Sequence, residues 1–280
     1  MGLIFVNGNE QSTISAIDRG VLYGDSLFET VAISNGKTLL LEQHLSRLEK
    51  GVDILGFDVD FSILKNEIAM FISFLQEKKR FVGNAVLRIT LTRGEQSRGY
   101  RPLSNSLCTR ILSVHDWPSS NKSAISVSVS DVRYSHQPIL AGLKHANRLE
   151  QVLAAQSIPE KMNDVVMLDI NDCIISASKG NLFIKLDGVW LTPKLNRCGI
   201  EGVVRNYLCT WFSQNGFSIK QDNIHIDMIM QQSDKVEAAF LCNSIVGVLP
   251  IKQFAGIDID SESVCQNIID DLIEHEVITA

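Results

Sequence analysis

The sequence predicts a two-domain protein of mixed α+β / α/β structure. Strand-like runs rich in β-branched residues alternate along the chain with segments in which apolar residues recur at helical spacing. The chain has 280 residues, of which 45% are hydrophobic, and this is enough for two modest cores. A polar, proline-containing stretch around 117–123 is the best candidate for a boundary. We therefore expect domains at 1–116 and 126–280, joined by a linker at 117–125.

The first half is expected to form a sheet with two helices. LIFVNGNEQS indicates a strand, an Asn-Gly turn and a return strand, and FETVAIS indicates a further strand before another turn. Apolar positions from Leu41 to Val52 then recur at helical spacing, and Gly51 and Gly56 mark the end. The remaining expected elements are a helix over 61–79 and strands over 84–94 and 110–117.

The second half opens with AISVSVSDVRYS, whose strict alternation is typical of a half-buried strand. A C-terminal helix begins after Ser261, a plausible N-terminal cap. The elements expected between them are a helix over 145–157, strands near 164–170, 173–177, 181–186 and 188–192, a helix from about 202, and a strand with a turn over 237–251.

Composition excludes several classes of function. The net charge is −6 with no basic block, so nucleic acid is not an expected partner. The six cysteines show no zinc-ligand spacing, and we expect reduced thiols and no metal site. The N-terminus lacks a basic segment, and no apolar run approaches the ~18 residues of a membrane span. A cytoplasmic protein that does not contact a membrane is expected.

Several short stretches can be read in two ways. GIEGVVRNYL (199–208) could offer unpaired N–H groups of a helix start to a phosphate, although most such starts bind nothing. The polar pair in CNSIVGVLPI could bind a ligand or only satisfy its own turn. Arg47, near the apolar face of its helix, could grip a phosphate or pair with a carboxylate. The basic loop LTRGEQSRGYRP could hold a carboxylate or simply be solvated.

GLKHANRLEQVLAA (142–155) raises the same question for Lys144. A lysine before a helix-like run is an ordinary surface feature, and the stretch alone does not distinguish a solvated charge from a reactive amine.

Seven motifs, taken together and in their order along the chain, favour the reactive amine for Lys144. They are DRGVLYGDSLFET (18–30), HLSRL (44–48), TRG…RGY (92–100), GLKHANRLEQVLA (142–154), NLF (181–183), TP…GIEGVVR (192–205) and CNSIVGVLP (242–250). Together they resemble the fold-type-IV pyridoxal-phosphate enzymes, the family of branched-chain and D-amino-acid aminotransferases. GLKHxNRLEQVL and the RGY loop are most similar to the branch of that family that acts as aminodeoxychorismate lyases.

The resemblance implies a cofactor, pyridoxal 5′-phosphate, covalently anchored by Lys144. It also implies a homodimer in which a loop of the neighbouring chain completes a site for a small-molecule substrate. The other residues that it implies are Arg47, Gly202, Val203 and Val204 with Asn243 and Ser244 at the cofactor phosphate, Ile200 against the ring, and Arg98 and Tyr100 on the carboxylate-facing loop.

Ser176 departs from the family pattern. Relatives carry a glutamate there, five positions before the residue matching Asn181, and its carboxylate keeps the pyridine nitrogen protonated; no acid lies within 173–181 here. Ala32 is a second departure, since relatives often have arginine. Either catalysis has been lost, as in a non-catalytic relative, or the Ser176 hydroxyl bonds an unprotonated nitrogen. The second case handicaps transamination by a branched-chain or D-amino-acid aminotransferase. It is compatible with eliminating pyruvate from 4-amino-4-deoxychorismate to give 4-aminobenzoate, the leading prediction.

Overall fold

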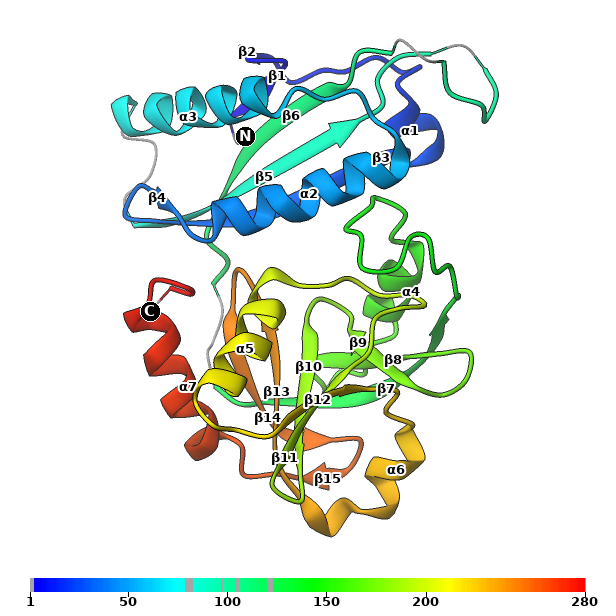
Figure 1. Cartoon of the computed structure of the whole chain (residues 1–280), viewed down its shortest axis with the longest axis vertical. Coiled ribbons are helices and arrows are strands. Elements are labelled where there is room, and N and C mark those ends of the chain that lie inside the picture. The colour runs from blue at the N-terminus through cyan, green and yellow to red at the C-terminus, as the bar shows by residue number, and fades with distance from the viewer. Residues whose placement is uncertain (1–2, 79–82, 97, 104–105, 120–122, 280) are drawn as a thin grey trace. The chain divides into compact units, whose positions relative to one another are not determined.

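The structure, a computed structural model, describes residues 3–78, 83–96, 98–103, 106–119 and 123–279 (Figure 1). The chain divides into two compact units. Unit 1 contains the described residues up to Ser119 together with Leu143–Asn147 and Thr279, and unit 2 contains the remaining described residues. Among the described residues, no helix is both long enough and apolar enough to cross a membrane.

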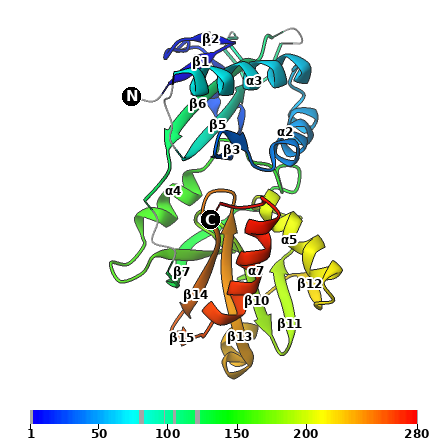
Figure 2. The same ribbon diagram turned by 90° about the vertical axis from the view of Figure 1, so that its left-hand side faces the viewer.

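Unit 1 is a six-stranded sheet in the order β2-β1-β6-β5-β3-β4, with two long helices packed on it (Figure 2). Odd-numbered residues of β3 and β5 join the core with apolar residues of α2 and α3, as the two-residue period of a strand requires. Its elements are β1 (Ile4–Val6), β2 (Asn9–Glu10), α1 (Arg19–Tyr23), β3 (Ser26–Ser34), β4 (Lys37–Thr38), α2 (Leu41–Leu55), α3 (Phe61–Glu77), β5 (Asn84–Thr92) and β6 (Thr109–Asp116).

Unit 2 is built on a nine-stranded mixed sheet along the path β12-β11-β10-β13-β14-β7-β8-β9, with β15 paired to β14. Ala177 donates to the Gly180 carbonyl, which brings the end of β9 to the start of β10. Its elements are β7 (Ile125–Tyr134), α4 (Leu149–Gln156), β8 (Asp164–Asp169), β9 (Ile174–Ala177), β10 (Asn181–Leu186), β11 (Val189–Pro193), α5 (Val203–Gln214), β12 (Ile219–Asp222), α6 (Ile226–Gln231), η1 (Ser233–Lys235), β13 (Val236–Asn243), β14 (Gly247–Phe254), β15 (Ile257–Asp258) and α7 (Glu262–Glu274).

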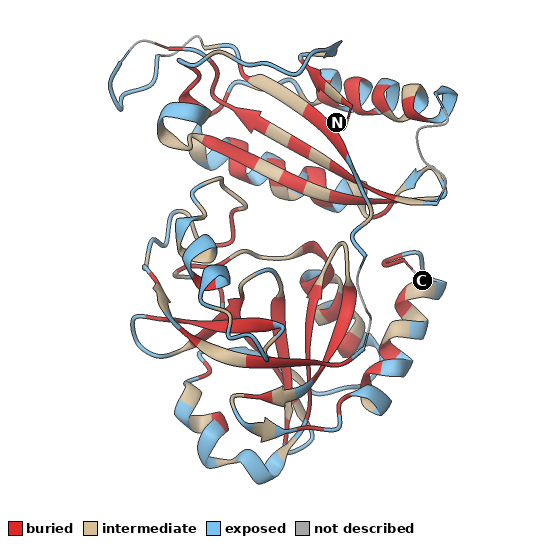
Figure 3. Ribbon diagram, turned by 180° about the vertical axis from the view of Figure 1, so that it is seen from behind, coloured by how far each residue is buried: buried red, intermediate tan, exposed pale blue. Residues whose placement is uncertain are grey.

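Burial follows the expected amphipathic patterns (Figure 3). Strands β8, β9, β10 and β13 of unit 2 are buried along most of their length, and α7 buries Cys265, Ile268 and Leu272 on one side. The helix expected from about 202 is confirmed, because α5 follows Gly202.

Three expectations were wrong. Gly51, expected at the end of its helix, lies inside α2, which continues to Leu55. The helix predicted over 145–157 begins only at Leu149, because the residues before it pair with β3. Ser261 precedes α7 but does not cap it: its hydroxyl donates to the Ile251 carbonyl and accepts from the Ala239 N–H. The Ser261 hydroxyl therefore bonds to the backbone of β13 and β14 and not to the first N–H groups of α7.

Candidate active site

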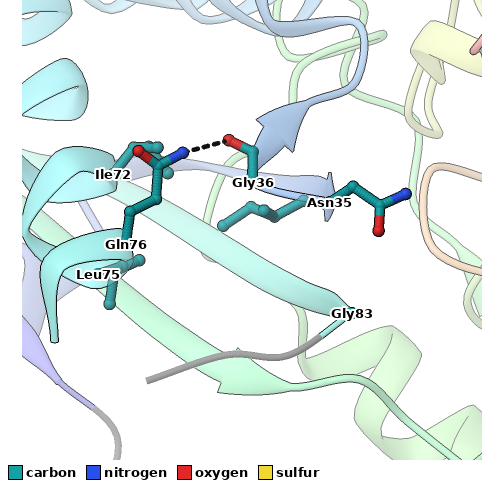
Figure 4. A pocket seen from close by; sticks show the side chains of 7 residues that line it. Asn35, Gly36, Ile72, Leu75, Gln76 and Gly83 are labelled. Atoms are coloured by element: carbon teal, nitrogen blue, oxygen red, sulfur yellow. Dashed lines mark hydrogen bonds between the residues drawn. The ribbon is translucent and has the colours of Figure 1, made fainter. Parts of the chain in front are cut away.

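A cavity of about 90 Å³ lies in unit 1 between the end of α3 and the β3–β4 turn (Figure 4). Ile72 and Leu75 line it, and Gln76 crosses its edge to donate to the Gly36 carbonyl at 3.2 Å. The described residues that line it include no charged or nucleophilic side chain, so we do not assign the active site to this cavity.

Lys144 lies on an extended segment that belongs to unit 1. Its carbonyl accepts from the Phe28 N–H at 2.9 Å, and the Ala146 N–H donates to the Ser26 carbonyl at 3.0 Å. These bonds add residues 144–146 to the edge of β3 for a short distance. The Lys144 ammonium lies 4.5 Å from the centre of the Phe28 ring, and the Arg88 guanidinium lies 4.1 Å from the same ring. The backbone of the lysine is thus held by sheet-type pairing.

Arg47 is part of a buried charge cluster in unit 1. Glu29 is fully buried on the helix-facing side of β3. Its carboxylate accepts from Nε and Nη2 of Arg47, and Nδ1 of His44 lies 2.6 Å from the same carboxylate. Burial raises the pKa of Glu29, but the charge of Arg47 and hydrogen bonds from His44 and Arg47 outweigh it and lower the pKa to about 2. The carboxylate is therefore ionised and fixes the plane of the Arg47 guanidinium. Of the two interpretations of Arg47, the structure shows the pairing with a carboxylate, that of Glu29.

The main chain of the loop that carries Arg98 and Tyr100 is held by hydrogen bonds from Arg19. Arg19 is buried, and its two terminal nitrogens donate to the carbonyls of Gly99 and Tyr100 at 2.8 and 2.9 Å. Asp25 accepts from Nε of Arg19 at 2.9 Å and from Nε of Arg93 at 2.6 Å. Tyr100 itself is 86% exposed. The main chain of this loop is therefore fixed, while the largely exposed Tyr100 ring contacts Tyr23 of the same unit, with 5.5 Å between ring centres.

The start of α5 in unit 2 is organised by Asn181. The Asn181 amide donates to the Ile200 carbonyl at 2.9 Å and accepts from the Gly202 N–H at 3.1 Å. Among the described residues, no side chain caps α5, so its first-turn N–H groups present the positive end of the helix dipole. Val203 and Val204 are buried, and their contribution to a ligand would be their backbone N–H groups.

The turn at Asn243 and Ser244 lies beside the same asparagine. Asn181 is paired with Cys242 across β10 and β13, one residue before Asn243. The Asn243 side chain accepts from the N–H groups of Ile245 and Val246 and donates to the Lys179 carbonyl. The side chain of Asn243 thus shapes the turn, and the structure places the turn and the start of α5 on either side of Asn181.

Ser176 lies at the same end of unit 2. The Ala177–Gly180 bond brings it close to Asn181, and Gly142, two residues before Lys144, pairs with Ile200. Ser176 is buried; its hydroxyl donates to the Ala177 carbonyl at 2.8 Å, and the Tyr134 hydroxyl lies 3.0 Å from it.

Sequence reasoning assigned no function to Tyr134, Asn181 or Glu29. Tyr134 closes an alternating strand, and nothing in the pattern of that strand indicates a partner on β9. The partner of Glu29 could have been predicted from the sequence. A charged residue at a core-facing position of β3, between Leu27 and Val31, requires a buried partner.

Comparison with known proteins agrees with this architecture. A model of the family described as amino-transferase class IV matches residues 26–254. The chain is 28% identical over 254 residues to an aminodeoxychorismate lyase of Vibrio harveyi, covering 89% of this chain and 90% of that protein. It is 21% identical over 274 residues to a D-alanine aminotransferase of Staphylococcus epidermidis, covering 94% and 93%.

The crystal structure of 4-amino-4-deoxychorismate lyase from Pseudomonas aeruginosa superposes with a TM-score of 0.90 at 32% identity, covering 99% of this chain and 100% of that one. The fold is therefore that of the fold-type-IV enzymes, as the ordered motifs predicted. The chain belongs to the class IV aminotransferase family.

Proposed function

We propose that this chain is a pyridoxal-phosphate-dependent lyase that converts 4-amino-4-deoxychorismate to 4-aminobenzoate and pyruvate, a step towards folate. The similarity to proteins named as such lyases supports it. The observation that carries the choice of reaction is the neutral pair formed by Ser176 and Tyr134 at the position where relatives carry a glutamate.

The residues of unit 2 fit the proposed cofactor. A phosphate needs N–H donors that no side chain covers, and Val203 and Val204 at the start of α5 supply them. Gly202 is assigned to the same turn, with its own N–H held by Asn181. The turn at Asn243 and Ser244 lies on the other side of Asn181 and is assigned as a second contact to the phosphate. Ile200 is held by Asn181 and Gly142 and is assigned to pack against the ring.

Arg47 of unit 1 is assigned to the phosphate, in an orientation set by Glu29. Lys144 is assigned as the covalent anchor. Bound to it, the cofactor would withdraw electrons from the substrate carbon that loses its proton.

Lys144 then has a second task. Its amine would take the proton from the ring carbon that bears the substrate's amine. The adjacent carbon–oxygen bond breaks, enolpyruvate leaves and takes up a proton as pyruvate, and the six-membered ring becomes aromatic. Aromatisation supplies the driving force, so the reaction depends less on a protonated ring nitrogen than transamination does.

Arg98 and Tyr100 are assigned to the substrate carboxylates of a neighbouring chain's site in a cytoplasmic homodimer. Their exposure on unit 1 and the anchoring of their main chain by Arg19 support this assignment, because a loop that serves another chain must be shaped by its own.

The experiment compares wild type with Lys144→Ala. We expect an absorption band of lysine-bound cofactor in wild type only, and pyruvate release from 4-amino-4-deoxychorismate in wild type only. A lysine-dependent band without pyruvate release would overturn the lyase assignment. No band in wild type would overturn the cofactor assignment as well.

An aminotransferase acting on branched-chain or D-amino acids is the second candidate, favoured by the similarity to a D-alanine aminotransferase. Incubation with amino acids alone separates the two. An aminotransferase converts its cofactor to the pyridoxamine form, whereas the proposed lyase leaves the spectrum unchanged.

A further inference from the structure

Tyr134 and Ser176 form a hydrogen-bond chain with a defined direction. The single Ser176 proton is directed to the Ala177 carbonyl at 2.8 Å, so at the 3.0 Å contact the Tyr134 hydroxyl is the donor and Ser176 the acceptor. Burial raises the pKa of the Tyr134 phenol, which keeps it protonated at neutral pH. While Ser176 donates to the Ala177 carbonyl, Tyr134 therefore donates to Ser176.

This direction determines what Ser176 can offer a ligand. A hydroxyl has one proton and two lone pairs, and one lone pair of Ser176 is taken by Tyr134. Accepting that bond polarises the hydroxyl, which makes it a better donor and a poorer acceptor. Its proton can turn from the Ala177 carbonyl to another acceptor while the Tyr134 bond is kept.

The positive charge of Arg148 beside this hydrogen-bond chain also disfavours a protonated nitrogen near Ser176. The guanidinium of Arg148 acts on the Tyr134 phenol, and Glu150 acts in turn on Arg148. Glu150 also accepts from the Ser135 N–H at 3.0 Å. A protonated ring nitrogen near Ser176 would face a neutral hydroxyl and a nearby cation, neither of which stabilises its positive charge. A carboxylate in place of Ser176 would have stabilised that charge.

Resting on the proposed function, we propose that Tyr134 is a positioning residue: by donating to Ser176 it makes this serine the hydrogen-bond donor to an unprotonated pyridine nitrogen of the cofactor. Tyr134 and Ser176 together thus replace the family's acid with a neutral donor. The consequence for specificity is that elimination is retained and transamination is suppressed.

The test uses the full-length protein loaded with pyridoxal phosphate labelled with ¹⁵N in the ring, in wild type, Tyr134→Phe, Ser176→Ala and the double variant. The ¹⁵N chemical shift at one neutral pH reports protonation and hydrogen bonding of that nitrogen independently of turnover. We expect the value of an unprotonated, hydrogen-bonded nitrogen in wild type. Tyr134→Phe should change the ratio of protonated to unprotonated nitrogen roughly two- to tenfold in favour of the protonated form, since a weakened donor corresponds to a fraction of a pKa unit up to one unit.

Because Tyr134 acts through Ser176, the double variant should match Ser176→Ala. Tyr207→Phe removes a phenol hydroxyl elsewhere in unit 2 and should leave the shift at its wild-type value. The inference is overturned if Tyr134→Phe also gives the wild-type shift, or if it still moves the signal when Ser176 is absent. Failure of wild type to take up the labelled cofactor would instead overturn the proposed function.

The unfolding temperature of each variant without cofactor separates a local effect from loss of the fold. If Tyr134→Phe does not fold, difluorotyrosine incorporated at position 134 keeps the shape and strengthens the donor. It should then move the ¹⁵N signal further from the protonated value, and an unchanged signal would overturn the inference.

Discussion

Gly202→Ala tests whether the side-chain amide of Asn181 holds the start of α5 in place. Gly202 has φ −66° and ψ 141°, which alanine adopts without strain, so the backbone itself does not require glycine. An added Cβ would lie 2.1 Å from Asn181 Oδ1, far inside contact distance. The Asn181 side chain must therefore move and release the Ile200 carbonyl and the Gly202 N–H.

The magnitude follows from those two bonds. Each contributes about 0.5–1.5 kcal/mol net, so their loss costs roughly 1–3 kcal/mol. Alanine offsets about 0.4–1 kcal/mol of this by reducing the freedom of the unfolded chain. We expect a free energy of unfolding lower by roughly 1–2 kcal/mol, together with weaker pyridoxal phosphate binding because the first turn of α5 shifts.

Urea unfolding followed by tryptophan fluorescence measures this, since Trp190 and Trp211 both lie in unit 2. The control is a double-mutant cycle with Asn181→Ala, which removes the amide that the new Cβ would meet. Gly202→Ala should cost almost nothing in that background. Stability equal to wild type for the single variant, or additive losses in the double variant, would refute the reasoning.

Three further outcomes are expected. The pKa of Glu29 lies at about 2 in the folded chain against an ordinary 4.5, so its contribution to stability is complete above pH 4.5 and is lost as the pH falls towards 2; Glu29→Gln should show a weaker acid dependence of urea unfolding in that window. Arg19→Lys cannot reproduce the fork to Gly99 and Tyr100, and trypsin should cut after Arg98 about tenfold faster or more, whereas Arg133→Lys, at an exposed ion pair with Asp172, should not change that rate. Finally, burial raises the pKa of all six thiols, but Cys173 and Cys209 are partly exposed whereas Cys108, Cys198, Cys242 and Cys265 are buried. A thiol reagent should therefore modify Cys173 and Cys209 first, by a factor of about ten or more; uniform reaction of all six would contradict this burial.

Periodicity predicted most of the fold, because long amphipathic elements carry their own signal. α2, α3, α5 and α7 all follow helical spacing in the sequence, and β3 and β7 follow strand alternation. The short α1, β12 and α6 were not predicted, since four to six residues hold too little periodicity to distinguish a helix or a strand from a turn. Residues 145–148 fail for another reason: pairing with β3 overrides a sequence that favours a helix when considered alone.

The candidate site was predictable only where the motifs are contiguous. The glycine at the start of α5 and the polar turn after β13 can be recognised by their chemistry, and the assignment of Lys144 depends on the ordered set of motifs. Partners supplied by distant strands were not accessible. Tyr134 and Ser176 are 42 positions apart, and only the arrangement of β7, β8 and β9 brings their hydroxyl groups together.

The pairing of Lys144 with β3 has a consequence for the timing of the proposed reaction. Because its main chain is bonded to Phe28 on an edge of the sheet, the amine can change position only by rotation about its own methylene bonds. Such rotations take picoseconds to nanoseconds, whereas a typical enzyme completes about ten cycles per second. Rotation of the lysine side chain is therefore too fast to limit the turnover of the proposed reaction.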